Sequence, residues 1–530
     1  MSGNINKLVY DLYKHIIRIE IISMMKKLLY LIVLLPSVGF AEEQIQISPA
    51  LAEMMKVEPL DPKRLENNFY VGQMGLYLPQ ENYLDLVKKH IQKQDIIGLQ
   101  FLNEYKINIF KQGDISPKFA RIEELIPKDM KKKSVVLKPL NGVVILDLKE
   151  YTPCLQYLNA NCIRQTLSIS TEINQALQEN QDLLKRFISL ISNSMYNDTI
   201  FPNGMDIGSI ELPSYQGMSK LYGLILSDAI LNIAYSNNQA GIELLSIARK
   251  RIDLQYNENS MPLLIDVMIT NQQAQFLDQT MNALLDSGLL THEMHNPQIE
   301  KIFRPYPKTI GSMLQQSILV ELNAIFKVNF YPYIKAFISL PISQQTMQKG
   351  SWLLMLNNHA KIISELNSIN EQGNIFDVDL INSMIQKDNA SITLEYLSPS
   401  MDDYIVRLYE QQNYHQLVYL KYLILRDDIS IRDIPEFLNS MGDLAKNTIT
   451  KERYHFNAET RVLSTPLPKE GKYIPHSVRQ AQQDDPSIQN LEVTIPLDRN
   501  CLNQLAPQGV PYEGAFKYQS LCREQNSFKK

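Results

Sequence analysis

The chain has little of the residues that mark the most specialised protein classes. Its 530 residues include 4 cysteines and 1 tryptophan. The chain has 52 basic and 57 acidic side chains, which gives a formal net charge of −5. A nucleic-acid-binding surface needs an excess of basic side chains to neutralise phosphates. This balance therefore argues against a nucleic-acid partner, and the one basic cluster, Lys128 with Lys131 to Lys133, is typical of a solvated turn.

Motifs for nucleotide binding and for serine nucleophiles are also missing. The sequence contains no Gly-x-Gly-x-x-Gly, no phosphate-binding loop and no Gly-x-Ser-x-Gly elbow. These motifs supply backbone amides for phosphates or expose a serine on a sharp turn. We therefore expect no cofactor, and whether the protein is an enzyme stays open.

The sequence has a single closely spaced pair of histidines, His292 and His295. A zinc protease needs His-Glu-x-x-His on a continuing helix, so that both imidazoles share one face. Here the spacing is one residue short, and we expect Asn296 and Pro297 to end any helix. The pattern predicts a surface loop and no metal site.

Long hydrophobic runs are absent, and the one short run lies near the start. Basic residues at the end of Met24–Lys27 precede the apolar stretch Leu28–Leu35, and small residues follow at Gly39 and Ala41. Spanning a bilayer takes roughly 20 apolar residues, so this pattern is typical of a secretory signal peptide. We predict translation from Met24 or Met25, cleavage after Ala41, and a periplasmic or secreted bacterial protein with no membrane span after cleavage.

The four cysteines would then work in an oxidising compartment, where an even number favours disulfides. Cys154 lies close to Cys162, and Cys501 lies nearest to Cys522. Local pairing is the simplest of the three possible connectivities, so we predict the disulfides Cys154–Cys162 and Cys501–Cys522. A zinc site needs a closer spacing or histidine partners, which these cysteines lack.

The mature chain divides into three regions by its patterning. Residues 42–166 read as a small α+β region. In it Glu66–Leu76 is expected to be an extended, closely packed segment because of its aromatic residues and two glycines. Tyr83–His90 is expected to be helical, and Asn141-Gly142 between β-branched runs predicts a hairpin.

Residues 167–450 read as a helical region, because apolar residues recur there every three or four positions. The predicted helices cover 171–196, 215–235, 241–254, 262–285, 313–326, 333–347, 352–366 and 402–407, the last continuing after Asn413. Successive helical hairpins of this kind build either an α-solenoid or a compact irregular bundle, and the sequence favours neither.

Residues 451–530 contain repeated prolines, which exclude long helices and predict an extended segment. We expect the Cys501–Cys522 bridge to pin this segment against the helical region. The predicted fold class is therefore mainly α, a helical-hairpin array or irregular bundle, with a small N-terminal α+β region and an extended Pro-rich C-terminal segment.

Several of these features together resemble uncharacterised helical envelope proteins of proteobacteria. They are Glu66–Leu76, the Cys154 and Cys162 pair, the helix from Thr171, Leu212–Tyr215 before a long helix, and the ending Gly509–Tyr518. The resemblance implies an exported location and a helical build. It implies no activity and assigns no functional residue.

No convergent set of catalytic residues stands out, so the leading prediction is a non-enzymatic exported protein. Its partner would be another protein or an envelope polymer. The alternative is an envelope hydrolase with an active site assembled from distant residues. His359, His415, Glu365 and Glu410 are its candidate residues, since histidine in a helical groove can titrate near neutral pH. A packed structural histidine is the competing interpretation of each.

Overall fold

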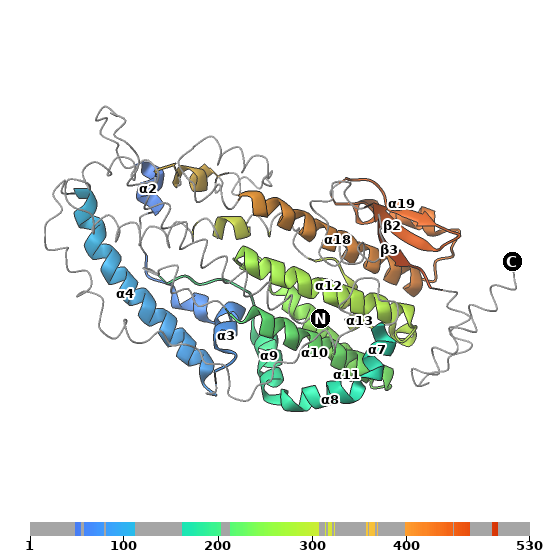
Figure 1. Ribbon diagram of the computed structural model, residues 1–530. Helices are drawn as coiled ribbons and strands as arrows, with labels where there is room; N and C mark the ends of the chain where they lie inside the picture. Colours follow the sequence, from blue (N-terminus) through green and yellow to red (C-terminus); the bar gives the residue numbers. More distant parts are fainter. Residues whose placement is uncertain are drawn as a thin grey trace.

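A computed structural model describes residues 48–54, 58–78, 81–111, 162–202, 213–306, 398–448, 450–466 and 490–496, with short helical stretches between 313 and 368. Most of the described elements are helices, and a small three-stranded sheet lies near the carboxyl end, so the predicted mainly α fold class is confirmed (Figure 1). The signal-peptide region, the 141–142 hairpin, the 333–347 helix and three of the cysteines lie outside the described residues and stay predictions.

The amino-terminal part contains four helical elements. They are α2 (Pro49–Met54), the 3-10 turn η1 (Pro62–Leu65), α3 (Phe69–Gly75) and α4 (Tyr83–Lys111). α4 is much longer than the predicted Tyr83–His90 segment and runs along one end of the molecule (Figure 1). Its buried side, Val87 and Ile91, packs in one cluster with Val71 of α3 and with Ile200.

The extended conformation expected for Glu66–Leu76 is wrong, because Phe69–Gly75 is a helix. The side chain of Asn68 accepts a hydrogen bond from the amide of Tyr70 and so caps this helix. The glycines allow close approach instead of extension. A Cβ added at Gly72 would lie 2.0 Å from Leu190 Cδ1, and one at Gly75 would lie 2.7 Å from Tyr83 Cδ2.

We expect Gly72→Ala to destabilise the protein. Alanine is favoured over glycine in a helix by about 0.5–1 kcal/mol, yet here its Cβ collides with the buried side chain of Leu190. Overpacking of this kind costs about 1–3 kcal/mol. This cost exceeds the gain in helix propensity, so the free energy of unfolding should fall. Urea unfolding followed by circular dichroism measures the change. The same substitution in a Leu190→Ala background should cost less, and equal costs in both backgrounds would contradict the packing explanation.

The helical body follows from residue 162. Its helices are α7 (Cys162–Ser168), α8 (Ser170–Glu179), α9 (Gln181–Asn193), α10 (Tyr215–Ala234), α11 (Asn238–Asp253), α12 (Leu264–Asp286), α13 (Pro297–Phe303), α18 (Ser398–Arg426) and α19 (Ile434–Ser440), with 3-10 turns η5 (Thr291–Glu293) and η6 (Gly442–Ala445). The predicted 171–196 helix is two helices that break at Asn180. The interruption expected at Asn413 does not occur, because Asn413 lies within the continuous helix α18.

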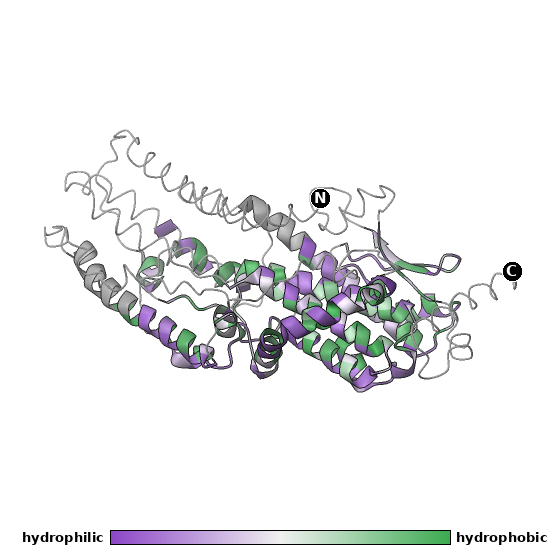
Figure 2. Cartoon of the chain, turned by 60° about the horizontal axis from the view of Figure 1, so that its bottom comes forward, coloured by the Kyte–Doolittle hydropathy of each residue, from purple (hydrophilic) through white to green (hydrophobic). Residues whose placement is uncertain are grey.

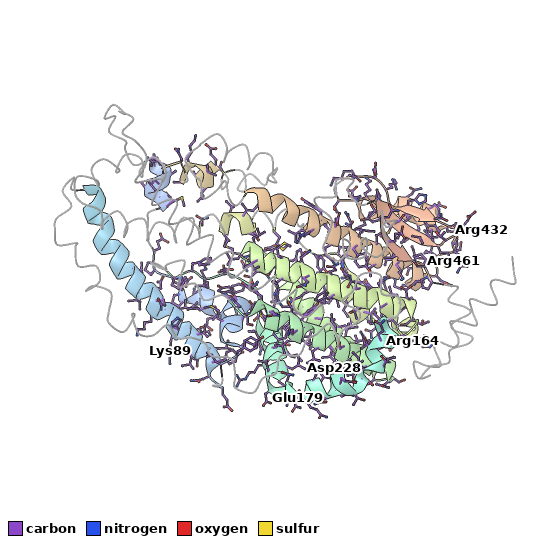
Figure 3. The ribbon with its side chains drawn as sticks, viewed as in Figure 1. Lys89, Arg164, Glu179, Asp228, Arg432 and Arg461 are labelled. Atoms are coloured by element: carbon purple, nitrogen blue, oxygen red, sulfur yellow. The ribbon has the colours of Figure 1, made fainter. Side chains whose placement is uncertain are left out.

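The arrangement of these helices is a bundle around two central members. α10 contacts α7, α8, α11 and α12, and α12 contacts α18 as well as α10 and α11. A solenoid would limit contacts to neighbours in sequence, so the described helices form the compact alternative. The buried apolar residues of the main core come from these helices, whose ribbons carry both hydrophobic and hydrophilic residues (Figure 2). Lys89, Glu179 and Arg432 are exposed charged residues at the periphery (Figure 3).

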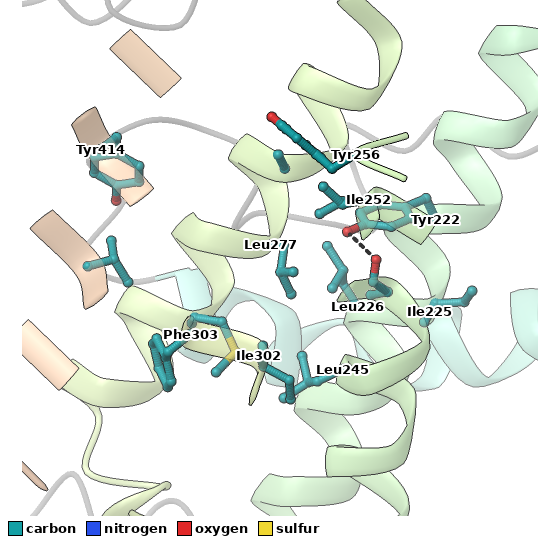
Figure 4. Close-up of a cluster of buried hydrophobic side chains, with 14 of the residues drawn as sticks. Tyr222, Ile225, Leu226, Leu245, Ile252, Tyr256, Leu277, Ile302, Phe303 and Tyr414 are labelled. Carbon is teal, nitrogen blue, oxygen red and sulfur yellow. Dashed lines mark hydrogen bonds between the residues drawn. The ribbon is translucent and has the colours of Figure 1, made fainter. Parts of the chain in front are cut away.

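The core between α10, α11, α12 and α13 is made of large apolar side chains (Figure 4). Tyr222 of α10 is fully buried, and its hydroxyl donates to the carbonyl of Ala248 in α11. The Phe303 ring at the end of α13 stacks on Tyr422 of α18, with ring centroids 4.3 Å apart. Burial of each such side chain contributes about 1.5–3 kcal/mol, so these contacts hold α18 to the body.

The sheet orders its strands β1 (His455–Asn457), β2 (Val462–Pro466) and β3 (Asn490–Thr494), all antiparallel. Leu463 is opposite both Phe456 and Val493, and Leu463 and Val493 are buried. Strands β2 and β3 contact α18. The start of the carboxyl-terminal region is therefore extended, as the prolines predict, and part of it packs as a sheet on the helical body.

The described part of the chain contains no helix that is both long and apolar enough to cross a membrane. Cys162 is buried as the first residue of α7. Cys154, Cys501 and Cys522 lie outside the described residues, so the predicted pairing of the four cysteines stays a prediction.

Candidate functional site

A buried polar joint lies where α18 meets α12 and the end of α13. His415 of α18 is 2% exposed, and its Nδ1 lies 2.8 Å from Oδ1 of Asp278 in α12. Its Nε2 lies 3.0 Å from the carbonyl oxygen of Arg304. Both partners are acceptors, so the ring can donate to both only when each nitrogen carries a proton. The joint therefore places one buried ring between a carboxylate and a backbone carbonyl.

The carboxylate of Asp278 and the carbonyl of Arg304 each accept a hydrogen bond from a second donor. The other carboxylate oxygen of Asp278 accepts from Nε2 of Gln411 at 2.6 Å. The carbonyl of Arg304 also accepts from Nη1 of Arg249 at 2.7 Å, and the same nitrogen donates to the carbonyl of Ile302. One cation from α11 and one histidine from α18 therefore converge on the chain that follows α13.

Aromatic rings enclose this joint. Tyr306 stacks on His415 with ring centroids 4.3 Å apart, and Tyr256 stacks on Tyr306 at 4.5 Å. The guanidinium carbon of Arg249 lies 4.3 Å from the centroid of the Tyr306 ring. Burial, followed by the nearby Asp278 carboxylate, raises the pKa of Tyr306 well above its usual value. Tyr306 therefore stays neutral and packs between Arg249 and His415.

Glu410 lies five residues before His415 on α18 and is also buried. Neither of its carboxyl oxygens has a hydrogen-bond partner among the described residues. Burial raises its pKa to about 8. The side chain is therefore mostly protonated at neutral pH, since a carboxylate without a partner is costly to bury.

A second buried polar network lies between α3, α11 and α12. Arg251 of α11 is fully buried, its Nη2 donates to Oγ1 of Thr270 at 3.1 Å, and its guanidinium carbon lies 4.4 Å from the centroid of the Phe69 ring. Burial lowers the pKa of Arg251 to about 10. Burial also raises the pKa of Asp266 to about 6, although Arg251 and hydrogen bonds oppose this rise.

The polar face of α12 explains why this network forms there. Asp266, Thr270 and Gln273 are four and three residues apart, so they share one side of the helix. That side faces the core, where an apolar stripe would be expected. This spacing is a sequence signal for the network, but it does not stand out within a helix of otherwise ordinary composition.

The structure shows other partners for the residues proposed for a hydrolase. Glu365 is exposed and lies 3.9 Å from Lys361 as an ion pair one turn away. His415 binds Asp278 and Arg304, and neither described glutamate is its hydrogen-bond partner. His359 lies outside the residues whose side chains are described. No described contact joins two members of this set.

The close histidine pair also lies on the surface. His292 belongs to η5, and His292 and His295 are both exposed. Asn296 and Pro297 begin a helix instead of ending one, because the Asn296 side chain caps α13 and Pro297 is its first residue. Among the described residues, no three histidine, cysteine or acidic side chains are placed to hold a metal ion.

The arrangement therefore uses its acid–base groups to join helices. His415 and Asp278 are both buried and engaged with each other, with Gln411 and with a backbone carbonyl. Comparison with known proteins adds no family, since no family model, curated protein or solved structure matches the chain.

Proposed function

We propose that this chain is an exported, non-catalytic helical protein that binds another protein, with an envelope polymer as the alternative ligand. The signal-peptide pattern that ends at Ala41 supports export. The use of His415 and Asp278 as a buried helix joint supports a structural role for the residues best suited to acid–base catalysis. A hydrolase would need such groups within reach of a substrate.

The distribution of exposed apolar side chains carries this proposal. Seven large apolar side chains are exposed among the described residues, and five of them come from α4 or from extended segments next to it. We call these five residues the α4-end surface: Leu84, Leu86, Ile96, Met195 and Met261. Exposed apolar groups that gather in one part of a protein are typical of an interaction site.

The two methionines belong to segments that are tied to the α4 end. The amide of Met195 donates to the carbonyl of Asn67, and Asp198 pairs in parallel with Met261. Ile200 continues the same segment and packs with Val87 and Ile91 of α4. Methionine adapts to irregular apolar surfaces, so this composition favours a protein partner over a glycan.

Site-specific photo-crosslinking in cells tests the proposal. A photoreactive residue at Ile96 or Met195 should capture one defined envelope protein, and the matched control at Tyr235 should not, because Tyr235 is equally exposed but follows α10 on another part of the body. In the crosslinked complex, the chain of this protein itself should begin at Glu42 if export and cleavage occur as expected. Equal capture from all three positions, or no capture, would count against the α4-end surface.

A further inference from the structure

The buried network between α3, α11 and α12 contains a guanidinium and a carboxyl group that are neighbours without a direct hydrogen bond. Arg251 and Asp266 are both fully buried. Burial shifts the pKa of each against its charged form, and each opposes this shift in the other, so the two groups lie near one another. Their described hydrogen bonds go elsewhere, from Nη2 of Arg251 to Thr270 and from Thr199 to Oδ2 of Asp266. Tyr215 of α10 also lies beside the Asp266 carboxyl group.

Polar atoms without a described partner gather in this network. They are Nε and Nη1 of Arg251, Nε2 of Gln255, Oδ1 of Asp266 and Oδ1 of Asn197. Asn197 belongs to the network because its Nδ2 donates to Oε1 of Gln255 at 2.6 Å. Thr270 links Gln255 to Arg251 through hydrogen bonds of 3.4 and 3.1 Å. Three donors and two acceptors are therefore buried there without a partner among the described residues.

Two glutamines extend the network. Gln73 follows Phe69 by one turn of α3, and the Phe69 ring lies against the guanidinium of Arg251. Gln273 follows Thr270 by three residues on the buried side of α12. Both glutamines are buried, and neither atom of either amide has a partner among the described residues. An amide buried without a hydrogen bond is costly, so these groups indicate a bound polar molecule.

We propose that this network is a binding site for internal water, with one water molecule bridging Arg251 and Asp266. Water fits because it donates and accepts hydrogen bonds at once, as the mixed set of donors and acceptors requires. A buried water makes about three hydrogen bonds to groups that would otherwise be unsatisfied, so the five atoms call for about two waters. The inference is independent of the α4-end surface.

Ions match the site less well than water. A chloride ion would suit the donors of Arg251 and Gln255, but it would leave the oxygens of Asp266 and Asn197 without donors. The Asp266 carboxylate would also repel it. A metal cation would meet the opposite difficulty at Arg251. Among the described residues, no three histidine, cysteine or acidic side chains are placed to hold such a cation.

The sign of a stability change tests the site, because methionine is close to glutamine in size but has no amide. If water satisfies the amide of Gln273, Gln273→Met removes those hydrogen bonds and the midpoint of urea unfolding should fall. If no water reaches the amide, the same substitution removes an unsatisfied polar group and the midpoint should rise. Gln73→Met should behave in the same way as Gln273→Met. A raised or unchanged midpoint in these two variants would overturn the proposal.

The control Gln298→Met makes the same chemical change at an exposed position of α13 and should leave the midpoint unchanged. Chloride is tested by comparing the unaltered protein in sodium chloride and in sodium gluconate at equal ionic strength. The two midpoints should agree, and a midpoint that rises with chloride would assign the site to an anion and overturn the assignment to water.

The bridge itself is tested by counting long-lived waters with oxygen-17 relaxation dispersion on the full chain. The double variant Arg251→Met/Asp266→Leu removes both ends of the bridge together, so no buried charge is left without its neighbour. It should hold about two fewer long-lived waters than the unaltered protein. Equal numbers in the two proteins would overturn the bridge.

Discussion

Replacement of Asp278 with alanine is expected to lower the free energy of unfolding of the helical body by about 3–5 kcal/mol. The substitution removes the acceptor of both the His415 ring and the Gln411 amide, which lie 2.8 and 2.6 Å from its oxygens. Both donors are buried, so neither can turn to water without disturbing α18. Buried donors that lose their acceptor cost far more than the intact hydrogen bonds gain.

Urea unfolding at neutral pH, followed by circular dichroism, measures this loss. Asp253→Ala is the matched control, because it removes the carboxylate partner of another buried side chain, Arg249. The Asp253 side chain is 32% exposed, however, and Arg249 keeps the carbonyls of Ile302 and Arg304 as acceptors. Asp253→Ala should lower the free energy of unfolding by about 1 kcal/mol or less. Similar losses for the two variants would mean that the joint does not hold α18.

Replacement of Phe303 with alanine is expected to cost about 3–5 kcal/mol. The ring is 1% exposed at the end of α13 and stacks on Tyr422 of α18. Its removal leaves a cavity between two helices that are far apart in sequence. The core there cannot collapse easily, since the hydroxyl of Tyr422 is fixed by a hydrogen bond to the carbonyl of Met294.

The control for this second substitution is Phe437→Ala in α19. Phe437 is half-buried and packs on the edge of the same core, so its loss should cost less than half as much. The same urea unfolding experiment compares the two variants. If they lose equal stability, the contact between α13 and α18 contributes no more than ordinary surface packing.

The sequence predicts most of the helical body because its signal is local. In α10, α11 and α12 the apolar residues recur at helical spacing, and the predicted bounds differ from the observed ones by at most three residues. The local pattern gives a wrong prediction at α3, where two glycines favour an extended segment but the residues form a helix. Gly72 is instead required by Leu190, which lies far away in sequence, and no local pattern contains that contact.

The joint around His415 could be predicted only in part for the same reason. Residue type identifies His415 and Glu410 as groups able to exchange protons, and both are buried on α18. The partner of His415 is Asp278, 137 residues earlier in the chain, and its other partner is a backbone carbonyl. Every residue has a backbone carbonyl, so the sequence does not show which carbonyl His415 contacts.

The placement of α2 has a consequence for the order of assembly. The amide of Ser48 donates to Oδ1 of Asn357, which lies 309 residues further along the chain, and Leu51 of α2 is fully buried in the main core. In a chain that emerges amino end first, the hydrogen bond of Ser48 cannot form until Asn357 has followed. Contacts of such long sequence separation form late, because a large loop must close first. The hydrogen bond between Ser48 and Asn357 is therefore among the last contacts to form, and the amino end of the described chain takes its final place only then.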